Sequence, residues 1–77
     1  MTIFRTADFG LTAFAICEGA RLIEISRDEP RRAVFILEGD LDEQELKEKF
    51  WNGGTVEVAK FIEAQREVKK RLFSDAF

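Results

Sequence analysis

Acidic side chains are concentrated between residues 38 and 48 of this 77-residue chain. They are Glu38, Asp40, Asp42, Glu43, Glu45 and Glu48. One interpretation is an electronegative surface that docks on a basic partner or mimics a nucleic-acid backbone. The other is a solvated helix N-terminus, where free backbone amides stabilise carboxylates. A calcium loop is excluded, because the further ligands and the central glycine of such loops are missing.

Basic side chains gather near the C-terminus and around one central turn. The first set is Lys60, Arg66, Lys69, Lys70 and Arg71, and the second is Arg27, Arg31 and Arg32. Both sets are candidates for contacts to nucleic-acid phosphates. Glu63 and Glu67 interrupt the first set at helical spacing, and no aromatic residue alternates with the bases as in a single-strand binding groove. The net charge of −3 also disfavours indiscriminate nucleic-acid binding. We therefore expect these bases to serve solubility first.

Trp51 is the one tryptophan, and Asn52-Gly53-Gly54 follows it directly. A tryptophan beside a glycine turn is a candidate anchor for a partner, because interface hot spots favour this residue. Alternatively, its ring covers the edge of the core. The glycine pair is not a phosphate loop, since the GxxxxGK[ST] pattern is absent.

The residue types that most enzymes use are scarce. The chain has no His, no Tyr and a single cysteine, Cys17, against eight Phe. Histidine is the side chain that titrates near neutral pH and the commonest metal ligand, so we expect no enzymatic activity, no metal and no cofactor. Cys17 is interpreted as a small buried hydrophobe, and nothing suggests an oxidising compartment. The apolar run from Phe9 to Cys17 is too short to span a bilayer. We therefore expect a cytoplasmic protein without a membrane partner.

Local signals mark the first elements. Residues 2–5 are β-prone and form either a short edge strand or a frayed end. Thr6 or Asp8 can then act as the N-cap of a helix, and Gly19 suits the turn that ends it.

The first helix, from Phe9 to Ala20, is expected to be the centre of the core. Its main apolar face would be Phe9, Ala13, Ile16, Cys17 and Ala20. Leu11 and Phe14 lie outside that face, so the helix must be covered on more than one side. The residues left to face water are Thr12, Ala15 and Gly19.

Two strands follow and predict a hairpin with its tip at residues 28–31. In the first strand, residues 21–27, Ile23 and Ile25 are expected on the buried face, while Leu22 breaks the alternation. The second strand, residues 32–38, is apolar on both faces at its centre, so its outer face needs a cover as well.

Two helices complete the chain. Asp42 and Glu45 form a capping-box pattern at the start of the second helix, with Leu46 and Phe50 facing inward and an Asn-Gly-Gly stop. The last helix runs from about residue 57 to 72. Its predicted apolar stripe is Val58, Phe61, Ile62, Gln65, Val68 and Leu72. Phe73 and Phe77 are candidates to pack back onto the core.

Four groups of residues carry a resemblance that covers about residues 6–73. They are Thr6-x-Asp8-Phe9-x-Leu11-x-Ala13-Phe14 with Gly19, Arg32-x-x-Phe35 with Glu38, Phe50-Trp51-Asn52-Gly53, and Arg66-x-x-Lys69-x-x-Leu72-Phe73. In these groups the chain resembles a family of small proteins of unknown function from bacteria, archaea and their phages. The family has no established catalytic residues, so none is transferred. The resemblance implies a small autonomous module of viral or mobile-element origin. By analogy, it implies an inhibitor of a host nucleoprotein, similar to anti-CRISPR proteins.

Together these observations predict a single α+β domain over residues 1–77, with its ordered core at about residues 6–73. The expected order is helix, β-hairpin, helix, helix, with an antiparallel two- or three-stranded sheet packed against the helices.

The leading functional expectation is a non-catalytic protein-binding module, whose partner the sequence leaves open. Its contact surface would be Asp40, Asp42, Glu43, Glu45, Glu48 and Trp51. The first alternative is a nucleic-acid accessory protein that uses Lys60, Arg66, Lys69, Lys70 and Arg71. The second is a homodimer with a seam at Leu11, Phe14, Val34 and Ile36.

Overall fold

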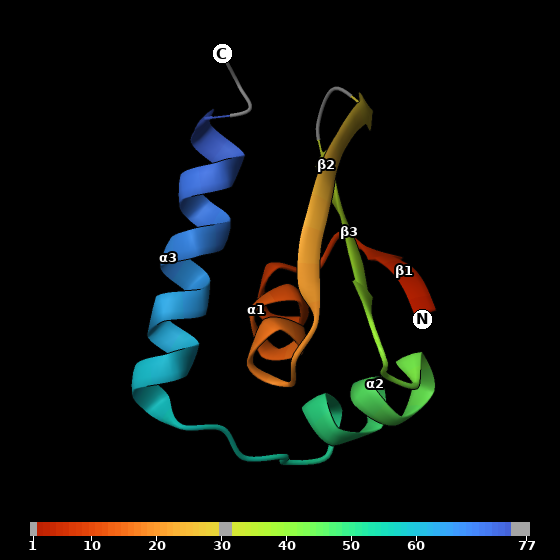
Figure 1. Ribbon diagram of the computed structural model, residues 1–77, viewed down its shortest axis with the longest axis vertical. Coiled ribbons are helices and arrows are strands. Elements are labelled where there is room, and N and C mark those ends of the chain that lie inside the picture. Colours follow the sequence, from red (N-terminus) through yellow and green to blue (C-terminus); the bar gives the residue numbers. More distant parts are fainter. Residues whose placement is uncertain (1, 30–31, 75–77) are drawn as a thin grey trace.

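Within residues 2–29 and 32–74, which the computed structural model describes, three helices pack against a three-stranded antiparallel sheet (Figure 1). The elements are β1 (Thr2–Thr6), α1 (Phe9–Cys17), β2 (Arg21–Glu29), β3 (Arg32–Gly39), α2 (Glu43–Trp51) and α3 (Val58–Ser74). The strand order β1-β3-β2 puts the third strand of the chain in the middle of the sheet. The α+β class predicted from the sequence is confirmed.

The N-terminal segment is a strand and not a frayed end. β1 pairs with β3 along its whole length, from Thr2 opposite Gly39 to Thr6 opposite Phe35. The ordered core therefore starts at Thr2, earlier than the expected residue 6. Three of the five residues of β1 are β-branched, a type that is enriched in strands.

A β-bulge in β2 shifts its alternation. Leu22 lies opposite Leu37 and Ile25 opposite Phe35, so three steps along β2 match two along β3. Leu22 and Ile25 are both buried, whereas the inserted Ile23 is 38% exposed. The prediction that Ile23 shares the buried face is therefore wrong, because an inserted residue reverses the side on which its neighbours point. Residues 30 and 31 of the expected hairpin tip lie outside the described residues.

The helix α1 lies between the sheet and α3 (Figure 1). Asp8 is its N-cap, as one of the two predictions had it, and its Oδ1 accepts the Leu11 amide at 3.0 Å. Gly19, with φ of +108°, adopts the left-handed conformation after the helix. The helix is shorter than predicted, since it ends at Cys17.

The burial of α1 differs from the prediction. Thr12 and Ala15, expected to face water, are fully buried. Phe9, Ile16 and Cys17, expected at the centre of the apolar face, are only partly buried. The reason is that two layers approach α1 from opposite sides, and close approach selects its smallest side chains.

The start of α2 follows the predicted cap. Asp42 Oδ1 accepts the amides of Gln44 at 2.9 Å and Glu45 at 3.1 Å. Leu46 is buried, and Phe50 packs on the core from its edge. Gly53, with φ of +81°, follows the end of the helix.

The predicted apolar stripe of α3 splits into two sides. Phe61, Val68 and Leu72 pack on the core. Val58 and Ile62 are 72% and 42% exposed, so their inclusion in the buried stripe is wrong. The predicted apolar residues span a wider arc of α3 than its single neighbour, α1, can bury. Phe73 is also exposed, and Phe77 lies outside the described residues.

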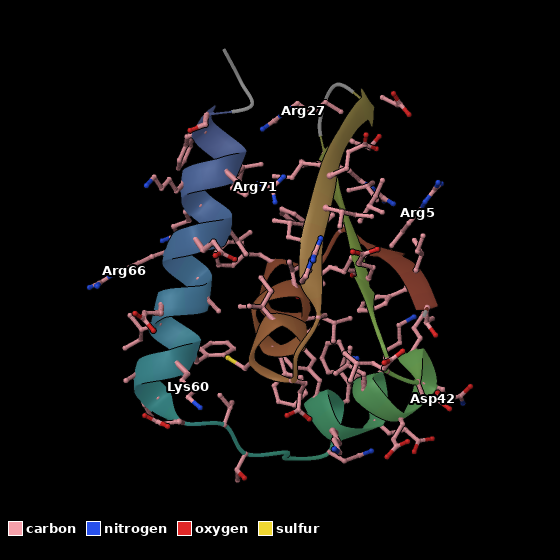
Figure 2. The ribbon with its side chains drawn as sticks, in the orientation of Figure 1. Arg5, Arg27, Asp42, Lys60, Arg66 and Arg71 are labelled. Atoms are coloured by element: carbon pink, nitrogen blue, oxygen red, sulfur yellow. The ribbon has the colours of Figure 1, made fainter. Side chains whose placement is uncertain are left out.

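Two arginines connect α3 to β2. Arg71 donates a hydrogen bond to the carbonyl of Leu22, and Arg27 donates one to the carbonyl of Leu72. Figure 2 shows both side chains in the space between α3 and β2. These two bonds join α3 to β2, which is an edge strand of the sheet.

We predict that Arg71→Met lowers the free energy of unfolding by about 1–3 kcal/mol, because a carbonyl loses a charged donor. Arg66→Met is the matched control, since Arg66 lies on the same helix and points away from the body of the molecule (Figure 2). Its effect should stay within about 0.5 kcal/mol. Urea denaturation followed by circular dichroism measures both values. Equal stability of the two variants would show that the contact between α3 and β2 does not depend on Arg71.

Candidate functional site

Several residues of the acidic segment have local structural roles. Asp42 caps α2. Glu43 accepts from Lys47 at 3.0 Å, one turn along the same helix. The Oε1 atom of Glu38, on β3, lies 3.2 Å from a guanidinium nitrogen of Arg21 on β2. These carboxylates are at least partly compensated, so the predicted six-residue acidic surface is not one uniform patch.

Glu45 and Glu48 are exposed on α2 and make no ion pair within the described part of the chain. Asp40 is also exposed, in the loop before the helix. The ammonium group of Lys49, on the same helix, lies 3.3 Å from the carboxylate of Glu18 at the end of α1. The open negative charge of this region therefore lies on the outer side of α2.

Trp51 ends α2 with its side chain 69% exposed. Its ring lies edge-on to Phe50, with centroids 5.1 Å apart, and Phe50 lies 5.6 Å from the ring of Phe14 in the core. Of the two interpretations of Trp51, covering the core is wrong, because Phe50 has that position. The indole is held against the body of the protein while most of its surface meets water.

A shallow hollow of about 640 Å³ lies beside Trp51. Its lining is Glu43, Gln44, Lys47, Glu48, Trp51 and Asn52. Gln44, Glu48 and Trp51 recur at four- and three-residue spacing and thus share one side of α2, with Glu45 on its flank. These four residues are termed the α2 surface below.

Several basic side chains of α3 interact with other residues of the fold. Arg71 bonds to the backbone of β2, as described above. The ammonium group of Lys69 lies 5.9 Å from the centre of the Phe9 ring, and the Nζ atom of Lys60 lies 4.0 Å from the Oε2 atom of Glu57. Three of the five predicted phosphate contacts therefore have partners in this chain.

The same bases do not share one face of α3. Arg66 points away from the molecule, whereas Lys60 and Arg71 lie on the side toward it (Figure 2). Of the second basic set, Arg27 bonds to α3, and Arg31 lies outside the described residues. The structure does not bring the predicted nucleic-acid residues together, because helical geometry distributes them around the axis.

The predicted homodimer seam is also divided. Leu11 and Phe14 are 3% and 2% exposed, so the chain itself covers them and a second copy cannot contact them. Val34 and Ile36 alternate with the core residues of β3 and therefore face the opposite side of the sheet. Ile36 is 8% exposed and lies opposite Arg5 of β1. The seam is wrong for α1, because α1 is internal to the fold.

An exposed apolar stripe on α3 was not expected from the sequence. Val58, Ile62 and Phe73 are 72%, 42% and 65% exposed and recur at helical spacing. Arg66 and Lys70 lie next to them on the exposed side. The apolar periodicity of α3 contains this signal, but periodicity alone does not say which half of a wide stripe is buried.

A second hollow, of about 530 Å³, lies between α1 and α3. Its lining is Ile16, Cys17, Lys60, Glu63, Ala64 and Glu67. Cys17 lines this hollow and is only partly buried, so its interpretation as a buried hydrophobe holds in part. No group of three metal-ligating side chains occurs in residues 2–29 and 32–74.

A comparison with models of protein families matches residues 1–74 to the family described as "Domain of unknown function (DUF5659)". The chain belongs to this family. The resemblance to a family of small proteins of unknown function is thereby confirmed, while the sequence motif and the range of organisms stay predictions. Neither the curated proteins nor the solved structures give a significant match. Among the described residues, no helix has the length and apolar character needed to cross a membrane.

The pKa of Cys17 is raised above its ordinary value, first by burial and then by the negative charge of Glu18, while Lys60 opposes the shift. A raised pKa leaves less reactive thiolate at neutral pH. We predict slow alkylation by iodoacetamide at about pH 8. The rate should rise as the pH increases beyond the usual pKa of a thiol.

Charge variants test the cause of this shift. Glu18→Gln should speed alkylation because it lowers the pKa, and Lys60→Met should slow it. Glu24→Gln, on a different element, is the control and should leave the rate unchanged. A slower reaction in Glu18→Gln would contradict the electrostatic explanation.

Proposed function

We propose that this protein is a non-catalytic, cytoplasmic module that binds another protein through the α2 surface and blocks the surface it covers. The observation that carries the proposal is Trp51, which is 69% exposed and yet fixed against Phe50. Tryptophan is the residue type most enriched among interface hot spots, because it offers a large contact area with few rotatable bonds.

The backbone beneath Trp51 is well defined, which favours binding. Asp42 satisfies two amides at the start of α2, and the ion pair of Glu43 with Lys47 spans its middle. A surface that is already ordered loses little conformational entropy when a partner binds. The α2 surface therefore supports binding without a folding step.

Charge indicates the chemistry of the partner. Glu48 lines the hollow beside the indole, and Glu45 lies farther along α2 on the flank of this surface. Both bases of α2 are paired, Lys47 with Glu43 and Lys49 with Glu18. The complementary surface is an apolar pocket for the indole with lysine or arginine at its rim. A basic surface of this kind is common on proteins that bind nucleic acids.

The family resemblance extends the proposal to the type of partner. A host nucleoprotein presents basic surfaces to its nucleic acid, and covering one of them would inhibit it by steric and electrostatic blocking. On this proposal the protein is an inhibitor similar to anti-CRISPR proteins, encoded by a phage or mobile element. This step rests on analogy with other small acidic proteins.

The test is affinity capture with the immobilised protein from an extract of the organism that encodes it. Trp51→Ala should reduce the affinity for the captured protein by about tenfold or more. Glu45→Lys with Glu48→Lys should also abolish capture. Asp42 stays unchanged in these variants, because its replacement would remove the cap of α2.

Phe73→Ala is the matched control, since Phe73 is an equally exposed aromatic residue on α3. It should capture the same protein as the wild type, and circular dichroism should show that all variants are folded. Unchanged capture by Trp51→Ala and the double lysine variant would reject the α2 surface. Loss of capture after nuclease treatment, with bands shifted in a low-salt gel, would favour nucleic-acid binding instead.

A further inference from the structure

The two edges of the sheet differ in how they are covered. The edge at β2 is bonded to α3 through Arg71 and Arg27. The edge at β1 faces outward, and no described element lies beyond it (Figure 1). Among residues 2–29 and 32–74, no strand pairs with the backbone groups on that side of β1.

Natural proteins protect open edges with proline, lysine, bulges or a covering element. β1 has the sequence Thr2-Ile3-Phe4-Arg5-Thr6 and pairs with β3 in one continuous register. It contains no proline, lysine or bulge, and three of its residues are β-branched. Ile3 is also 60% exposed beside this edge. Such a strand is suited to pairing with another strand.

We propose that β1 pairs antiparallel with β1 of a second copy of this chain, about a two-fold axis at Phe4. The two sheets then form one continuous sheet. Its strand order is β2-β3-β1 in one copy, followed by β1-β3-β2 in the partner. This surface is separate from the α2 surface, so the proposal does not depend on the proposed function.

The strand is complementary to itself in this register. Thr2 lies opposite Thr6 of the partner, and Phe4 opposite Phe4 of the partner, on the face that the helices cover. Ile3 lies opposite Arg5 of the partner on the open face, where Arg5 points away from the helices (Figure 2). No like charges face each other, and the aliphatic stem of Arg5 can cover the exposed Ile3.

Neighbouring registers are less favourable. A shift of one residue places an inward side chain opposite one that points outward. The helices of the second copy would then lie on the opposite face of the joint sheet. A shift of two residues toward Thr6 places Arg5 opposite Arg5 of the partner, and like charges in that position are destabilising. A shift of two residues toward Thr2 keeps the face and opposes no like charges, but it leaves Arg5 and Thr6 without partners in the partner's β1. The register centred on Phe4 is therefore favoured because it alone pairs the whole strand with matching faces and no opposed like charges.

Symmetry limits the assembly to two copies. Each copy contributes the same strand, so the interface is isologous and uses the one uncovered edge. The opposite edge, at β2, carries the two arginine bonds to α3 and takes no part in this interface. This is the reason that the occupant we infer is a second copy and not an endless stack.

Sedimentation velocity between about 1 µM and about 1 mM tests the proposal. The wild type should form dimers as its concentration rises. Ile3→Lys places a lysine opposite Arg5 of the partner and should raise the dimer dissociation constant about tenfold. Ile3→Glu places a carboxylate there and should dimerise at least as well as the wild type.

Two further variants separate pairing from misfolding. Ile3→Lys combined with Arg5→Glu restores opposite charges and should recover dimerisation. Ile23→Lys introduces the same charge at an exposed isoleucine of β2 and should leave dimerisation unchanged. A wild type that stays monomeric over the whole range would overturn the proposal. Equal weakening by Ile3→Lys and Ile3→Glu, or by Ile23→Lys, would overturn it as well.

Discussion

The fold depends on the burial of one nine-residue helix, α1, between the sheet and α3. A chain of this size has little apolar surface to bury, so a helix covered from both sides contributes more than one lying on the surface. The contacts require small residues: Ala13 and Ala15 are fully buried, and a side chain at Gly10 would come within 3.2 Å of the Phe50 ring. The buried hydroxyl of Thr12 is satisfied by the carbonyl of Asp8 at 2.8 Å. Nothing polar inside α1 is therefore left without a partner.

The position of α1 decides which surfaces remain open. It occupies the inner face of the sheet and one side of each of the other helices, and the phenylalanines Phe4, Phe14 and Phe35 fill the space around it. The edge of β1 and the outer sides of α2 and α3 are left to water, whereas Ile36 on the outer face of the sheet is only 8% exposed. The large exposed apolar residues of the described part of the chain are Ile3, Ile23, Trp51, Val58, Ile62 and Phe73, at the edges of the sheet and on α2 and α3.

Features that depend on local chemistry could be predicted from the sequence. Asp8 and Asp42 cap helices because a short carboxylate reaches the amides two or three residues ahead. Features that depend on distant neighbours could not. The exposure of Ile23 follows from a bulge that only the pairing with β3 defines. The role of Arg71 follows from its proximity to Leu22, 49 positions away in the chain. The side of α3 that is buried likewise depends on where α1 lies.

The same distinction applies to the candidate site. From the sequence, the acidic segment is the leading contact surface and the basic helix is the first alternative, and the fold uses their charges differently. Arg71 and Lys69 interact with β2 and Phe9, whereas Glu45 and Glu48 have no ion-pair partner in residues 2–29 and 32–74. The carboxylates of Glu45 and Glu48 are therefore open to contact, whereas part of the basic charge of α3 is used within the fold. If two copies join at β1, each dimer presents two α2 surfaces. A partner with repeated binding sites can then contact both surfaces at once. Its affinity for the dimer exceeds its affinity for one surface, because the first contact raises the effective concentration for the second.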